Sequence, residues 1–81
     1  MTALTILINA FENALELPIS EINDSLEYNS HKKWDSTAHM ILIAQLENDF
    51  DVMFDIDDII DMSSFVKAKE ILLKYDGKIS F

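Results

Sequence analysis

The amino-acid sequence predicts an all-α fold: a small bundle of three main helices and one short helix, with a long loop between the first two. The chain of 81 residues holds one glycine and one proline, so hairpin turns are scarce. Its apolar residues recur at helical spacing. Its length allows one domain, residues 1–81, in which residues 76–81 form a short C-terminal tail.

A first helix is indicated by an apolar stripe at i, i+3, i+4, i+7 and i+11, which consists of Leu4, Leu7, Ile8, Phe11 and Leu15. Pro18 ends it, because proline cannot continue the hydrogen-bond ladder. A long connection, residues 16–34, follows. We expect an ordered crossover loop with a short helical turn near residues 20–24. Its apolar residues are expected to anchor it on the core: Leu17, Ile19, Ile22, Leu26, Tyr28 and Trp34.

A second helix is predicted to begin after Asp35, since aspartate is a favoured N-cap, and to run to about Phe50. Residues 40–46 are apolar at almost every position, which indicates a central helix packed on several sides. We expect Met40 to lie in the core and Trp34 to pack near it.

Two further helices are predicted after residue 51. Asp55 is the expected cap of a short third helix, whose buried face consists of Ile56, Ile59 and Ile60. Ser63 is the expected cap of a fourth helix, whose apolar stripe consists of Ala68, Ile71, Leu72 and Tyr75.

The composition excludes several classes of function. There is no cysteine, which rules out a disulfide scaffold, a zinc–thiolate site and a cysteine nucleophile. The net charge is −9 and arginine is absent, which disfavours binding to nucleic acid or to anionic membranes. No secretory signal or membrane-spanning run is visible, so we expect a cytoplasmic monomer that does not insert into membranes.

The most informative stretch is Trp34-Asp35-Ser36-Thr37, at the start of the second helix. With Asp35 as the cap, Ser36 occupies the first helical position and its hydroxyl is free to face solvent. The first-turn N–H groups and the helix dipole favour an anion attached to that oxygen.

This stretch resembles the Asp-Ser-Leu attachment motif of the acyl carrier protein family. The resemblance continues in Leu46-Glu47-Asn48-Asp49-Phe50, which is similar to the family's Leu-Glu-Glu-Glu-Phe, and in Ser63-Ser64, where Thr-Thr is common. Upstream, Leu15, Leu17 and Ile22 match as well. The similarity covers nearly the whole chain.

The resemblance implies a carrier and not an enzyme. Ser36 would receive covalent 4′-phosphopantetheine from coenzyme A through a phosphopantetheinyl transferase, with Asp35 and Thr37 flanking it in the motif. The thiol of the arm would hold an acyl group as a thioester. One alternative is an aminoacyl or peptidyl carrier of the D-alanyl type. Another is an acidic helical interaction module that carries nothing.

Three departures from the family pattern indicate a specialised pathway, such as surface-glycan modification or secondary metabolism, in place of housekeeping fatty acid synthesis. Thr37 replaces the usual leucine. Residues 31–34, His-Lys-Lys-Trp, place two cations before the serine. The start of the second helix is neutral, and Glu47 is the next acid after Asp35.

An acidic segment in the second half of the chain is either a solvated face or a docking face. The partners implied are acyl ligases, synthases or acyltransferases with basic surfaces. The candidate partner-binding residues are Glu47, Asp49, Asp51, Asp55, Asp57, Asp58 and Met40.

Part of the core between the second and third helices is a candidate shelter for an acyl chain. The candidates are Met40, Ile43, Phe54, Ile59, Met62 and Ile71. No metal site is expected, since the residues after Asp49 do not fit a calcium-binding loop. A Ser36–His39 hydrolytic dyad is disfavoured because nothing supplies an oxyanion hole. His31 and His39 are expected to be surface residues.

Overall fold

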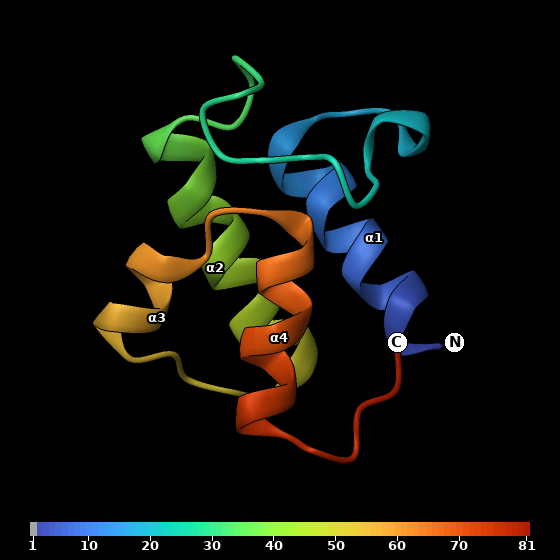
Figure 1. The fold of residues 1–81 in the computed structure, drawn as a ribbon, viewed down its shortest axis with the longest axis vertical. Coiled ribbons are helices and arrows are strands. Elements are labelled where there is room, and N and C mark those ends of the chain that lie inside the picture. The colour runs from blue at the N-terminus through green and yellow to red at the C-terminus, as the bar shows by residue number, and fades with distance from the viewer. Residues whose placement is uncertain (1) are drawn as a thin grey trace.

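The computed structural model describes residues 2–81, in which every regular element is helical. Three longer helices, α1 (Ala3–Leu15), α2 (Ser36–Phe50) and α4 (Phe65–Tyr75), pack together, and the short α3 (Ile56–Asp61) lies beside them. Residues 16–35 cross one end of the bundle before α2 begins (Figure 1). The predicted fold class, including the long first connection, is confirmed.

The core is formed by the predicted stripes of α1 and α4 together with one face of α2. Phe11 lies at its centre, with Trp34 edge-on at 5.3 Å and Phe65 edge-on at 5.1 Å between ring centroids. The fully buried large side chains are Trp34, Phe11, Leu7, Leu42, Leu46, Met62 and Leu72. Burial of aromatic rings of this size dominates the energetics of a small core.

The long connection is ordered by a short helical turn and by backbone bonds from its middle to the rest of the fold. It contains a 3-10 helix, η1 (Ile19–Glu21), slightly before the predicted turn. Farther along, the Tyr28 N–H donates to the Ser63 carbonyl at 2.8 Å, and the Phe65 N–H donates to the Leu26 carbonyl at 3.0 Å. These two bonds fix the middle of the loop to the junction of α3 and α4. The expected anchors are buried or half-buried except Ile19, which is exposed.

The predicted burial of α2 is only partly correct. One face is buried, through Leu42, Ile43 and Leu46, whereas Met40 and Ala44 are exposed although both were expected in the core. Trp34 is buried and packs against Phe11, Tyr28 and His39. The apolar run from residue 40 therefore belongs to a helix with one free face, because no other helix covers its outer side.

The buried face predicted for α3 is wrong. Ile56 and Ile60 are 72% and 74% exposed, Ile59 is half-buried, and Asp58 is only 7% exposed. The carboxylate of Asp58 turns inward because it binds two groups of α4, the Lys74 ammonium and the Tyr75 hydroxyl, each at 2.5 Å. This network sets the rotation of a helix too short for its apolar periodicity to do so.

Two capping details also differ from expectation. Ser64, and not Ser63, caps α4, since its hydroxyl accepts the Lys67 N–H at 2.9 Å. Asp55 stands at the N-cap of α3 but makes no capping bond with its side chain. At the other ends of two helices, Glu16 and Asp51 are left-handed, each with φ 54°, although neither is glycine.

Asp58→Asn is expected to lower the thermal midpoint at pH 7 and to reduce the further loss on acidification. Hydrogen bonds from Lys74 and then Tyr75 hold the pKa of Asp58 below its ordinary value of 3.8. The stability that this carboxylate contributes is therefore complete above pH 3.8 and is lost as the pH falls through the lower folded-state pKa. Circular dichroism melts at pH 7 and pH 3 measure both effects.

The matched control is Asp57→Asn, which changes an exposed neighbour on the same helix. Its melting curve is expected to follow the wild type at pH 7. Equal midpoints for the two variants at both pH values would contradict the structural role of Asp58.

Candidate functional site

The start of α2 has the geometry that the sequence predicts for an attachment site. The Asp35 carboxylate accepts the Ala38 N–H at 2.9 Å and so caps the helix. Ser36 is the first helical residue and its side chain is exposed. Because the aspartate does the capping, the serine hydroxyl remains accessible, beside first-turn N–H groups that have no acceptor within the helix.

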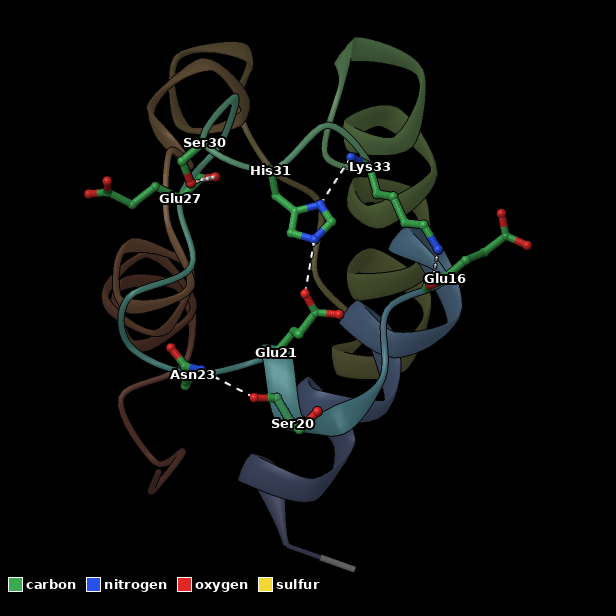
Figure 2. Close-up of polar contacts among 8 residues, drawn as sticks. All are labelled: Glu16, Ser20, Glu21, Asn23, Glu27, Ser30, His31 and Lys33. Carbon is green, nitrogen blue, oxygen red and sulfur yellow. Dashed lines mark hydrogen bonds and ion pairs between the residues drawn. The ribbon is translucent and has the colours of Figure 1, made fainter.

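Polar contacts within the long loop hold the segment that leads into Ser36. The His31 ring accepts the Lys33 N–H at 3.1 Å through Nδ1 and contacts Glu21 at 3.2 Å through Nε2 (Figure 2). The Lys33 ammonium donates to the Glu16 carbonyl at 2.9 Å, at the end of α1. The segment before Ser36 is thus bonded to η1 and to the end of α1. Lys33 donates to a carbonyl that has no donor within the helix.

A pocket of about 310 Å³ opens directly beside Ser36. It is lined by Tyr28, Ser36, His39, Met40, Ile59, Ile60 and Met62. Met40 is 56% exposed and forms part of the rim, whereas Met62 is almost completely buried and forms part of the floor. The serine therefore stands at the mouth of a largely apolar recess between α2 and α3.

His39 lines this pocket and separates it from the buried Trp34. Its Nδ1 accepts the Trp34 indole N–H at 3.0 Å, and its Nε2 donates to the Ile59 carbonyl at 2.7 Å. These partners fix the neutral tautomer with the proton on Nε2. The expectation that His39 is a surface residue is wrong, since its ring is partly buried and its two nitrogens are both engaged. Neither nitrogen is left to take a proton from Ser36.

The candidate pocket residues fall into two groups. Met40, Ile59 and Met62 line the pocket beside Ser36, as predicted. Ile43, Phe54 and Ile71 do not line it; they are buried in the packed core.

Thr37 and Asp35 lie on a second hollow on the other side of α2, of about 350 Å³. That hollow also contacts Lys32, Lys33 and the end of α1. The two residues that flank Ser36 in the motif therefore face away from the apolar recess.

The acidic residues that are candidates for partner binding differ in their exposure. Asp49, Asp51, Asp55 and Asp57 are exposed. Glu47 is half-buried and accepts the Phe54 N–H at 3.0 Å, so part of its charge serves the turn before α3. The placement of Asp58 on an exposed docking face is wrong, because its carboxylate is buried against Lys74 and Tyr75.

Sequence reasoning did not place Tyr28, His39 or Ile60 at the pocket. Tyr28 comes from the long loop and reaches the site through the tie between the loop and Ser63. A histidine three residues after the serine is on the same helical side, and that spacing was a usable signal for His39. Ile60 was assigned to the buried face of α3.

Two negative findings apply to residues 2–81. Within them, no group of three or more His, Asp or Glu side chains is arranged to hold a metal ion. No helix among them combines the length and the apolar character needed to cross a bilayer.

Asp35→Ala is expected to destabilise the fold by about 1 kcal/mol, because it removes the side-chain cap of α2. This corresponds to a fall of roughly 4–8 °C in the melting temperature of a domain of this size. Asp55→Ala is the matched control, since Asp55 occupies an N-cap position without a side-chain bond. Urea unfolding measures both, and an equal loss from the two variants would contradict the assigned cap.

The chain was compared with models of protein families, with curated proteins and with solved structures, and none of the three comparisons gave a match. The resemblance of the Asp35-Ser36 motif to acyl carrier proteins thus rests on the residues of this chain alone. It stays a prediction, to which the fold and the geometry around Ser36 contribute physical arguments.

Proposed function

We propose that this protein is a carrier of acyl groups, held as thioesters on a 4′-phosphopantetheine arm attached to Ser36. The observation that carries the proposal is the exposed Ser36 side chain at the first position of a helix capped by Asp35, at the mouth of an apolar pocket. The spacing of Asp35-Ser36 from Phe50 and from Ser63-Ser64, which resembles the spacing in acyl carrier proteins, adds support.

The residues around Ser36 fit such an arm. The serine oxygen would form a bond to the phosphorus that carries pantetheine as the pyrophosphate P–O bond of coenzyme A breaks. Adenosine 3′,5′-bisphosphate leaves, and the hydroxyl proton passes to a base of the transferase. The first turn of α2 presents N–H groups and the positive end of the helix dipole to the phosphate. When attached, the arm supplies a thiol, which this chain lacks because it has no cysteine. Met40 and Ile60 offer apolar surface beside the attachment point.

The proposal includes enzyme partners with basic surfaces near their own active sites. Asp49, Asp51 and Asp57 present exposed negative charge, and the overall charge of −9 favours fast encounter with cationic surfaces. Around Ser36 itself the surface of α2 is neutral, with Thr37 and Ile41 exposed. This arrangement supports specialised partners, which would recognise apolar contacts near the serine and negative charge farther along the chain.

Incubation with coenzyme A, Mg²⁺ and a promiscuous phosphopantetheinyl transferase is expected to add the mass of one phosphopantetheine group. Intact-protein mass spectrometry measures the gain, and peptide mapping is expected to place it on Ser36. Ser36→Ala is expected to abolish the gain, because it removes the only atom to which the group is proposed to attach.

The matched control is Ser63→Ala, which removes the hydroxyl of another exposed serine. It is expected to be modified like the wild type. An unmodified wild-type protein, or a gain that survives Ser36→Ala, would reject the carrier function and favour an interaction module. After modification, loading by an acyltransferase or by an amino-acid ligase distinguishes acyl from aminoacyl cargo.

A further inference from the structure

We infer that His39 limits the length of cargo that the pocket can bury, so that short acyl or single-ring groups are sheltered in full and long alkyl chains are not. This inference rests on the proposed function, because it concerns what is attached through Ser36. It is carried by the position of the imidazole between the pocket and the buried Trp34, with both nitrogens bonded to neighbouring elements.

Buried aromatic rings lie behind His39, on the side away from the pocket. Trp34 stacks on the imidazole, with ring centroids 6.0 Å apart and planes inclined by 25°. The indole is fully buried and packs edge-on against Phe11 in the centre of the core. A chain that extends past His39 meets close-packed aromatic rings, and protein interiors hold few voids larger than a water molecule.

Hydrogen bonds from α3 and from the two residues before it oppose separation of this helix from its neighbours. The Ile59 carbonyl is bonded to His39 of α2, and the Phe54 N–H is bonded to Glu47 of α2. On the other side, the Tyr75 hydroxyl of α4 accepts the Asp55 N–H at 2.8 Å and donates to Asp58. A long chain would have to break such bonds to enter, leaving buried polar groups without partners.

The volume sets the size of the cargo. An apolar cavity of about 150 Å³ holds one benzene ring. The pocket beside Ser36 measures about 310 Å³ and also has to accept the end of the arm. The apolar part of the cargo that the pocket can bury is therefore limited to about one ring or about six carbons.

The test attaches acyl arms of increasing length. Acetyl-, butyryl-, hexanoyl-, octanoyl- and dodecanoyl-coenzyme A serve as donors for the transferase, and intact mass confirms each product. For the wild type, the melting temperature is expected to rise by roughly 3–6 °C for each methylene that becomes buried. The rise is expected to stop near hexanoyl, with no further gain at octanoyl or dodecanoyl.

His39→Ala removes the barrier and is expected to shift the end of the rise to octanoyl or beyond. His31→Ala is the matched control, since it removes the other histidine, which lies in the loop and does not line the pocket. It is expected to keep the wild-type limit. Met40→Ala opens only the rim and is expected to reduce the stabilisation by short chains without moving the limit.

The outcomes separate the two proposals. A mass gain on Ser36 with a melting temperature that still rises from hexanoyl to dodecanoyl would overturn the length limit and leave the carrier function intact. A folded His39→Ala protein with the wild-type limit would overturn the role of His39. If that variant does not fold, the wild-type series alone decides. Absence of any mass gain would overturn the carrier function, and the inference with it.

Discussion

The imidazole of His39 joins three parts of the molecule that are distant in the chain. It accepts a hydrogen bond from Trp34 at the end of the long loop, stands on α2, and donates to the Ile59 carbonyl of α3. The buried indole therefore has a partner for its N–H, as a buried tryptophan requires. This one ring therefore fixes the position of the long loop, which leads into Ser36, relative to α3, which lines the pocket.

Most of the fold was accessible from the sequence, because it depends on local rules. The stripe from Leu4 to Leu15 and the cap at Asp35 act over a few residues, and each is decided by helix geometry. The choice between Ser63 and Ser64 as the cap of α4 was not accessible. Both residues are good caps. The start of α4 is decided by the loop, because the Ser63 carbonyl accepts from Tyr28 and the Phe65 N–H donates to Leu26.

The site was only partly accessible, since it depends on which side each helix presents. The exposure of Ser36 follows from the identity of the cap and was predicted. The orientation of α3 was not, because fewer than two turns give too weak an apolar signal to outweigh the bonds of Asp58 with Lys74 and Tyr75. An isoleucine assigned to the core, Ile60, consequently lies at the rim of the pocket.

The left-handed residue at the end of α2 leaves room for engineering. Asp51 adopts a conformation that suits glycine, and it places a negative charge at the negative end of the helix dipole. It lies at the opposite end of α2 from Ser36, roughly 22 Å away along the helix axis. A glycine at position 51 would remove both unfavourable features and make the protein more heat-resistant, and it would also remove one of the exposed charges proposed to attract partners.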